Sequence, residues 1–319
     1  MTATIPDALW TDDPFPSTAG AEAQPASDAA GLPDSPVPPL RVGLIGFGRT
    51  GRDVAAVLLG DAGARLEWVV RRSTSTPSSR ASEALGIAGV DDCPIVTAGT
   101  RGADDLLDQS PVDAIIDFSS EDGLAYYGDA AARRGIPIVT AVSHYSESRQ
   151  RDLRRHGRTT PVLWSPNITL GINFILIASK VLKRVSPHAD VQVIEEHFSG
   201  KQGRSGTALK LAAALALPET AVHSVRAGGI IGVHEVVFGY PNQTVRLRHE
   251  AISREAFGHG ALFAAGQLAT REPGNYLMED LLLPYFSGTA CLSDDAPPVD
   301  RRVRARVAGR LRALAGWLD

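Results

Sequence analysis

The order of apolar and polar positions divides the chain into short buried strands and amphipathic helices that alternate from Leu40 onward. Arg41–Ile45 and Val112–Phe118 are nearly continuous apolar runs, and between them apolar positions recur at helical spacing. The expected strands of this half are 41–45, 66–70, 112–118 and 137–141, and the expected helices are 52–59, 123–134 and 146–155. Strands that alternate with helices are typical of a parallel, doubly wound sheet, so this half predicts an α/β fold.

Near Pro161–Asn167 the pattern changes to a long apolar helix and then to closely spaced segments rich in β-branched residues. The expected strands are 191–196, 222–227, 232–238 and 244–251, and the expected helices are 171–185, 206–216 and 256–269. This composition and spacing predict a second, α+β domain with a mostly antiparallel sheet.

The two ends of the chain differ from the middle. Residues 1–40 contain eight prolines, six acidic residues and no Lys or Arg, so we expect a flexible leader. Residues 291–319 form a C-terminal extension that we expect to be helical, since Val303, Val307, Leu311, Leu314 and Trp317 recur at helical spacing. Packing against this protein or a second subunit is its expected role.

Composition narrows the class of partner. With 44% hydrophobic and 21% charged residues and a net charge of −4, the chain has the balance of a globular protein and no basic field for nucleic acid. No apolar run approaches the ~20 residues of a membrane span, and no secretion signal is recognisable. Cys93 and Cys291 have no metal-ligand or redox spacing. We therefore expect a cytoplasmic protein without a metal site, a membrane or a nucleic-acid partner.

A glycine turn follows the first strand and opens a helix. In it we expect Gly46 to supply the tight turn, Gly48 the close approach of backbone to a pyrophosphate, and Gly51 the close helix packing, as in a dinucleotide site. The expected cofactor contacts here are Gly46, Phe47, Gly48, Arg49, Thr50 and Gly51. At the end of the second strand, Arg71 and Arg72 replace the acidic residue that favours NAD, which indicates NADPH, with NADH possible.

The segment from His197 to Thr207 carries candidate chemistry in the second domain. His197 can exchange a proton near neutral pH, and Lys201 supplies a positive charge four residues later. Ser205, Gly206 and Thr207 open a helix whose free N–H groups and hydroxyls suit a carboxylate. The pattern predicts an enzyme that acts on a small anionic substrate.

From Val42 to Asp280, the chain resembles the dihydrodipicolinate reductase (4-hydroxy-tetrahydrodipicolinate reductase) family of diaminopimelate and lysine biosynthesis. The resemblance rests on the glycine turn with Arg52 and on the segments 116–119, 165–173, 197–207, 232–238, 249–257 and 276–282. It implies a Rossmann-like nucleotide domain at 41–165 and 270–290, and a substrate-binding and oligomerisation domain at 166–269. It also implies hydride transfer from NAD(P)H to an unsaturated cyclic amine dicarboxylate, by a homo-oligomer, tetramer or dimer.

Residue by residue, the resemblance gives His197 the part of the acid and Lys201 that of the catalytic lysine. Ser205, Gly206 and Thr207 match the substrate-carboxylate loop. Four further cofactor contacts are implied at Phe118, Ser119, Thr140 and Ala141.

The chain departs from the family pattern around the expected substrate. Phe198 stands where the family has a second histidine, and Val142 stands within the segment that matches its Gly-Thr-Thr-Gly. An expected Asp-x-Pro is absent from the loop Gln202–Arg204, and the first glycine turn is one residue shorter.

Because each change removes or moves a polar partner, either the substrate differs or Arg204, a further expected substrate contact, compensates together with its neighbours. We favour the first alternative, a divergent cyclic imine or enamine reductase in specialised metabolism. The authentic lysine-pathway reductase and a non-catalytic NADPH-binding homologue are the alternatives.

Overall fold

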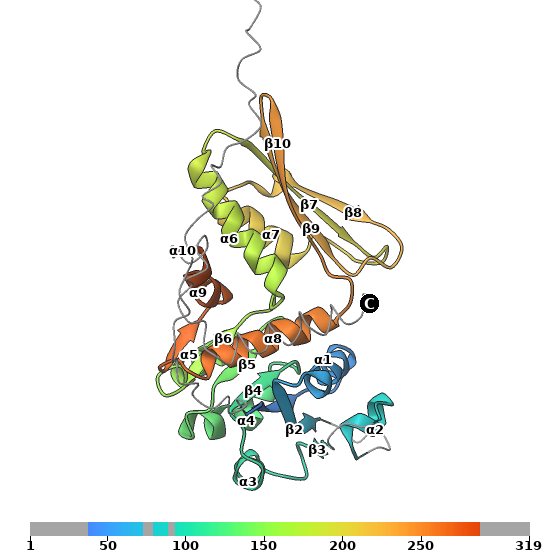
Figure 1. Cartoon of the computed structure of the whole chain (residues 1–319), viewed down its shortest axis with the longest axis vertical. Coiled ribbons are helices and arrows are strands. Elements are labelled where there is room, and N and C mark those ends of the chain that lie inside the picture. The colour runs from blue at the N-terminus through green and yellow to red at the C-terminus, as the bar shows by residue number, and fades with distance from the viewer. Residues whose placement is uncertain (1–37, 73–78, 89–92, 288–319) are drawn as a thin grey trace, which may run out of the picture. The chain divides into compact units, whose positions relative to one another are not determined.

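The computed structural model describes residues 38–72, 79–88 and 93–287, which form two β-sheets and the helices that cover them (Figure 1). Nearly all of the expected leader at 1–40, and the whole expected extension at 291–319, lie outside the described residues.

The first sheet has seven strands in the order β11-β6-β5-β4-β1-β2-β3, and every pairing is parallel. The strands are β1 (Leu40–Ile45), β2 (Ala64–Arg71), β3 (Ile95–Thr97), β4 (Ala114–Asp117), β5 (Ile138–Thr140), β6 (Pro161–Trp164) and β11 (Gly274–Tyr276). The chain runs outward from β1 through β2 to β3 and then returns to β4 on the other side of β1. Doubly wound sheets bind ligands where the order reverses in this way, beyond the carboxyl ends of β1 and β4.

Helices cover both faces of this sheet and give it two apolar cores. One core joins the sheet to α1 (Arg49–Gly60), α8 (Glu255–Leu268) and α9 (Met278–Leu282), while α2 (Ala81–Leu85) adds Ala81. The other joins it to α3 (Ala103–Gln109), α4 (Gly123–Arg133) and α5 (Glu147–His156). The sheet is therefore buried on both faces, as its apolar strands require.

Helix α8 belongs to the first core, although the expected domain boundary at residue 269 assigns it to the second domain. Ala261, Leu262, Ala264, Ala265 and Leu268 of α8 are all buried in the core formed by β1 and α1. This packing differs from the expected boundary, because an apolar helix does not reveal from sequence which sheet it covers.

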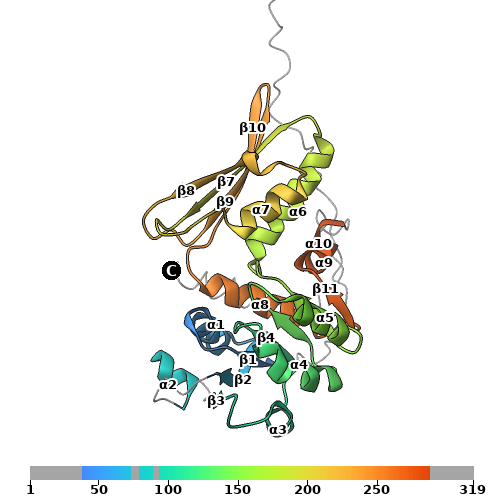
Figure 2. The same ribbon diagram turned by 180° about the vertical axis from the view of Figure 1, so that it is seen from behind.

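The second sheet has four strands in the order β10-β9-β7-β8. The strands are β7 (Asp190–His197), β8 (Val222–Arg226), β9 (Val233–Tyr240) and β10 (Gln243–Glu250). Two of the three pairings are antiparallel and β7 pairs with β8 in parallel, so the sheet is mostly antiparallel, as expected. Its core holds side chains of α6 (Leu170–Val185) and α7 (Gly206–Ala214), which lie on the same side of the sheet in both views (Figures 1 and 2).

Each helix and strand expected within the described residues is present, with ends shifted by a few residues. Several short elements were not expected: α2, β3, β6, β11, the 3-10 turn Glu219–Ala221, α9 and α10 (Pro284–Ser287). Segments of three to five residues are too short to show a period of 2 or 3.6. Helix α3 was also missed.

The helices of the described ranges include none with both the length and the apolar character needed to cross a lipid bilayer.

Candidate functional site

The glycine turn lies at the carboxyl end of β1, at the point where the strand order reverses. Gly46 has φ of +98°, a left-handed conformation that glycine adopts readily. A Cβ on Gly51 would lie 2.1 Å from the carbonyl oxygen of Gly46, so only glycine lets α1 begin this close to the strand. A Cβ on Gly48 would meet no atom within 4 Å, so the backbone there faces open space. The three positions have the geometry that a pyrophosphate on the N-terminus of α1 requires.

A cavity of about 260 Å³ opens beside this turn. The residues that line it come from α1, from the loops after β4 and β5, from Pro166 and from α8: Thr50, Phe118, Ser119, Ala141, Val142, Ser143, Pro166 and Phe257. Four of the expected cofactor contacts and the expected substrate contact Val142 thus lie around one space. It lies beyond the carboxyl ends of β1, β4 and β5, where doubly wound sheets bind dinucleotides.

Thr140, expected to contact the cofactor, lies behind the cavity wall instead. Its side chain is fully buried, and its Oγ1 is 2.8 Å from the hydroxyl of Tyr145 and 3.3 Å from the backbone N of Val142. Thr140 ends β5 with its side chain turned into the core. It can therefore support the loop after β5 but does not face a ligand.

Asp117, at the end of β4, is a fully buried carboxylate next to the same cavity. Its oxygens accept hydrogen bonds from Ser119, from Tyr127 and, at 3.5 Å, from Tyr145. Burial raises the pKa of Asp117 to about 6, and these hydrogen bonds limit the rise. In the sequence, Asp117 belongs to the matching segment 116–119, and no pattern there indicates a role for it.

A second cavity, of about 290 Å³, adjoins the first, since Ser143 and Pro166 line both. It extends to Gly206 and Lys210 of α7 and to Glu279 of α9, where the Lys210 Nζ lies 3.3 Å from the Glu279 Oε1. The space beside the glycine turn therefore continues to the helix start that was expected to hold a carboxylate. Neither cavity is lined by His197 or Lys201.

His197 ends β7 and is largely buried. Its Nδ1 lies 2.9 Å from the carbonyl oxygen of Ile231. Its Nε2 lies 3.2 Å from the Oε2 of Glu195, close enough for ion pairing but without the alignment of a hydrogen bond. Burial and the nearby charge of Lys201 lower the pKa of His197, against the raising effects of the Ile231 carbonyl and Glu195. The imidazole is therefore neutral at pH 7 in this state.

Glu195 and Arg226 form a buried ion pair beside His197 that sequence reasoning missed. Arg226 Nη2 donates to Glu195 Oε1 at 2.6 Å, and Ser224 donates to the same oxygen at 2.6 Å. Arg226 also donates to the carbonyl oxygens of Lys201 and Gly203. Although burial alone would raise the pKa of Glu195, these donors lower it. One guanidinium thus holds both the carboxylate and the loop that carries Lys201.

His234 on β9 is a second missed residue. Its Nε2 lies 2.9 Å from Ser205 Oγ, and its ring meets that of His197 edge to face with centroids 5.3 Å apart. Burial, and next the neighbouring His197, lower the pKa of His234 to about 3, so it remains neutral. Ser205 Oγ also accepts from the backbone N of Ala208 and so caps α7. The hydroxyl of Ser205 is therefore already bonded within the protein.

The other expected substrate residues occupy different settings. Thr207 donates to Asn167 Oδ1 at 2.6 Å, in the segment between β6 and α6. The guanidinium of Arg204 lies 3.4 Å from Glu219 and from the carbonyl oxygen of Val222. Phe198 is 48% exposed, beside His197 in sequence and outside the core.

Glu195, His197 and His234 are of metal-ligating type, and one donor atom of each lies within 4.8 Å of the others. Arg226 pairs with the carboxylate, however, and Lys201 places a second positive charge near both histidines. Two cations at this distance oppose a divalent ion, so the arrangement suits proton handling better.

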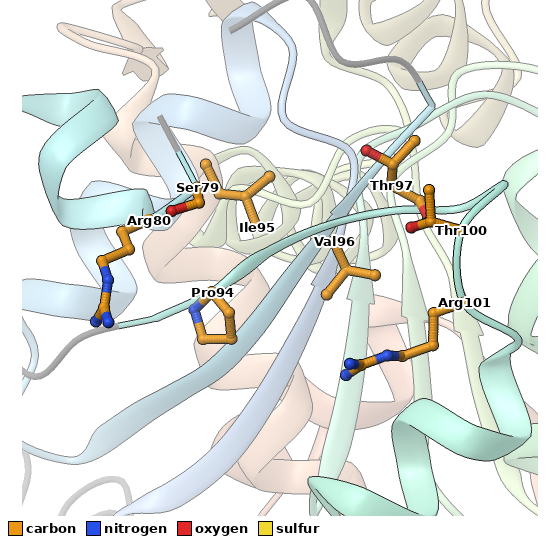
Figure 3. Close-up of a pocket in the computed structure, with 8 residues that line it drawn as sticks. All are labelled: Ser79, Arg80, Pro94, Ile95, Val96, Thr97, Thr100 and Arg101. Carbon is orange, nitrogen blue, oxygen red and sulfur yellow. The ribbon is translucent and has the colours of Figure 1, made fainter. Parts of the chain in front are cut away.

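The expected 2′-phosphate residues lie at the carboxyl end of β2. Arg71 pairs with Thr97 of β3, and Arg72 is exposed next to residues outside the described ranges. Beside β3 lies a hollow of about 700 Å³, in which Thr97, Thr100 and Arg101 lie toward the carboxyl end of the strand and Arg80 lies near its start (Figure 3). Hydroxyl and guanidinium groups therefore gather near Arg71.

Replacement of Arg226 by Lys tests whether the guanidinium stabilises both Glu195 and the loop that carries Lys201. A single ammonium cannot reach three acceptors in different directions, so we expect the free energy of unfolding at pH 7 to fall by about 1.5–3 kcal/mol. Arg133→Lys, in an exposed ion pair with Asp104, is the matched control and should cost much less, because water screens that pair. Equal losses of unfolding free energy in the two variants, measured by denaturant titration, would contradict this role of Arg226.

Comparison with known proteins identifies the family. The models described as dihydrodipicolinate reductase, N-terminus, and dihydrodipicolinate reductase, C-terminus, match residues 40–168 and 168–282. A protein of Oleidesulfovibrio alaskensis named 4-hydroxy-tetrahydrodipicolinate reductase is 30% identical over 261 residues, which are 74% of this chain and 96% of that protein. One of the same name from Caldanaerobacter subterraneus subsp. tengcongensis is 35% identical over 192 residues, 53% of this chain and 76% of that protein.

A solved structure shares the fold. The dipicolinate-bound dihydrodipicolinate reductase from Paenisporosarcina sp. TG-14 is 18% identical, with a TM-score of 0.61, over 75% of this chain and 97% of that one. Since the two family models together span both sheets, the chain belongs to the dihydrodipicolinate reductase family of NAD(P)H-dependent oxidoreductases.

Proposed function

We propose that this chain reduces a C=N or conjugated C=C bond in a small cyclic imine or enamine carboxylate, with a substrate that differs from that of its named relatives. The family and the dinucleotide-type turn support the reductase class. The local departures around His197 support the different substrate.

The cofactor supplies a hydride when it is bound. The free N–H groups at the start of α1 would hold its pyrophosphate, and Arg49 and Thr50 border the same turn. Arg71, whose strand position pairs with Thr97, and the nearby Arg80 and Arg101 support a 2′-phosphate and therefore a preference for NADPH over NADH. The cavity between Phe118 and Val142 would take the nicotinamide end.

The start of α7 would hold a substrate carboxylate. Ser205 caps the helix, which leaves the N–H groups of Gly206 and Thr207 directed outward with the positive end of the helix dipole. Lys201 would add a charge from the preceding loop. The Thr207 hydroxyl donates to Asn167, which lies in the segment between β6 and α6. A substrate carboxylate that accepts from this hydroxyl would therefore break the contact with Asn167.

The proton step falls to His197 in this proposal. As hydride adds to the ring carbon, an electron pair moves onto the nitrogen or the conjugated carbon, and one proton must be supplied there. His197 is neutral without substrate because burial and Lys201 disfavour its charge. A bound carboxylate offsets that positive charge and raises the pKa, so the proton would enter with the substrate.

The single observation that carries the divergent substrate is Phe198. Its ring is 48% exposed next to the proposed acid, in a loop where a polar side chain could meet a second carboxylate. A phenyl ring offers no hydrogen bond, and a substrate carboxylate left unpaired against it would cost about 1–3 kcal/mol. A substrate with an apolar substituent on that side removes the conflict.

The authentic 4-hydroxy-tetrahydrodipicolinate reductase reaction is the second candidate. The names of the relatives and the presence of His197, Lys201 and Ser205–Thr207 at matching positions favour it. The third candidate, a non-catalytic NADPH-binding homologue, would have the glycine turn without turnover.

The rate of NADPH oxidation distinguishes the three candidates. Purified protein and NADPH are mixed with freshly generated dihydrodipicolinate and, separately, with a panel of cyclic imine carboxylates. We expect oxidation of NADPH with a member of the panel and at least ~10-fold lower kcat/KM with dihydrodipicolinate. His197→Ala and Lys201→Ala should lower turnover by about 100-fold or more while NADPH affinity stays within about twofold. Faster reduction of dihydrodipicolinate would overturn the divergent substrate, and binding without any turnover would favour the third candidate.

We further propose that the free face of the second sheet joins subunits into a homo-oligomer. This face, opposite α6 and α7, carries the charged residues Glu196, Glu235, Arg246 and Arg248 in a network of ion pairs. No helix among the described residues covers this face, which supports pairing with another copy of the chain. Light scattering during gel filtration should give a dimer or tetramer of the 33.8 kDa chain; a monomer at micromolar concentration would contradict this.

A cytoplasmic location agrees with the free Cys93 thiol, which is buried and whose pKa burial raises to about 12, so it is unreactive.

A further inference from the structure

The loops after β4 and β5 both line the cavity of about 260 Å³, and both are tied to the same buried carboxylate. We propose that Asp117 is a positioning residue for the nicotinamide half of the cofactor, because each of its carboxylate oxygens holds one wall of this cavity. The inference rests on the NAD(P)H use of the family and on no particular substrate. It therefore stands apart from the proposed reaction.

Oδ1 holds the loop after β4. It accepts the backbone N–H of Ser119 at 2.8 Å and the hydroxyl of Ser119 at 2.6 Å. Phe118 and Ser119 both line the cavity. The two bonds fix the turn that directs these residues toward the ligand.

Oδ2 holds the loop after β5 through Tyr145. The Tyr145 hydroxyl lies 3.5 Å from Oδ2 and 2.8 Å from Thr140 Oγ1, which in turn accepts the N–H of Val142 at 3.3 Å. Val142 is part of the cavity wall. A chain of three side chains thus connects the carboxylate to the opposite side of the space.

Tyr127 offers a matched comparison within the same network. It donates to the same Oδ2 at 2.9 Å, but it comes from α4 and does not line the cavity. Tyr127 and Tyr145 are both fully buried. Loss of either hydroxyl therefore removes a donor to Asp117, and only loss of the Tyr145 hydroxyl breaks a connection to a cavity wall.

The carboxylate is held without a cation in contact with it. The groups that face it in the described residues are the hydroxyls of Ser119, Tyr127 and Tyr145 and the start of α4, where a Cβ on Gly123 would lie 3.5 Å from Oδ2. Four donated hydrogen bonds require acceptors at both oxygens, which only the ionised form provides in full. Since burial raises the pKa of Asp117 to about 6, that form is complete only at neutral pH and above.

Calorimetric titration of the full chain with NADPH and with 2′,5′-ADP separates the two halves of the cofactor. We expect Tyr145→Phe to raise the Kd for NADPH by about fivefold to tenfold and to leave the Kd for 2′,5′-ADP within about twofold of its original value. Tyr127→Phe should leave both ligands within about twofold. Asp117→Asn should act as Tyr145→Phe does, or more strongly.

Equal weakening of NADPH by the two tyrosine variants, or equal weakening of NADPH and 2′,5′-ADP by Tyr145→Phe, would reduce Asp117 to a structural role and overturn the inference. These binding readings do not depend on turnover. If the proposed reaction fails but Tyr145→Phe still weakens the binding of NADPH and not that of 2′,5′-ADP, the role of Asp117 stands.

The pH dependence gives a second readout. NADH, which has no 2′-phosphate to titrate, should bind the unaltered chain several-fold more weakly at pH 5.5 than at pH 7.5, because Asp117 gains a proton over this range. The exposed His144 of the same loop and Glu121, which accepts from Ser146, are retained in Asp117→Asn. That variant should show no such fall; an equal fall would assign the effect to another group and contradict the role of Asp117.

Discussion

Helix α1 begins directly against the end of β1, with the position of a Gly51 Cβ only 2.1 Å from the Gly46 carbonyl oxygen. No side chain fits between the two segments, so the first turn of the helix lies at the point where the strand order of the sheet reverses. The loops after β4 and β5 reach the same side of the sheet because β4 is a parallel neighbour of β1 and β5 is a parallel neighbour of β4. The cavity lined by Phe118, Ser119 and Val142 follows from this one close contact and from the parallel order of the strands.

Each half of the molecule then uses one buried carboxylate to organise a loop. Asp117 is surrounded by neutral donors, and burial raises its pKa. Glu195 is paired with Arg226, and the net effect is a lowered pKa despite burial. The first arrangement ties two walls of a cavity to a carboxylate whose hydrogen-bond donors, among the described residues, are neutral groups. The second leaves Lys201 in a loop beside a histidine whose pKa is lowered by burial and by that charge.

The sequence was sufficient for those features that depend on neighbours along the chain. The turn from Gly46 to Gly51 and the alternating strands could be predicted, because local spacing determines both. Arg226 could not be linked to Glu195, which is 31 residues away and lies next to it only because β7 and β8 pair in parallel. The sequence predicts Thr140 as a ligand contact, whereas its side chain faces the core. Local sequence does not decide this, because the residue that ends a strand can face either the core or the cavity.

Other omissions have a similar cause. His234 lies at a buried position of β9, where a polar residue in an apolar strand was the available signal, but its partner Ser205 comes from another element. Helix α8 has an apolar surface that either sheet could cover, and its contact with α1 depends on the path of the chain through both domains. Pairing between distant segments, and not local preference, decided these cases.

In the proposed reaction, a dinucleotide on the first domain delivers hydride to a ring held by the second, near His197. The most direct measurement uses NADPH with deuterium at the transferred C4 position, and the product is analysed by mass spectrometry and NMR after a single turnover with a cyclic imine carboxylate. The account predicts one deuterium at the reduced ring carbon and a solvent proton at the nitrogen or conjugated carbon. Label that remains entirely in the cofactor, for every ring tested including dihydrodipicolinate, would contradict it.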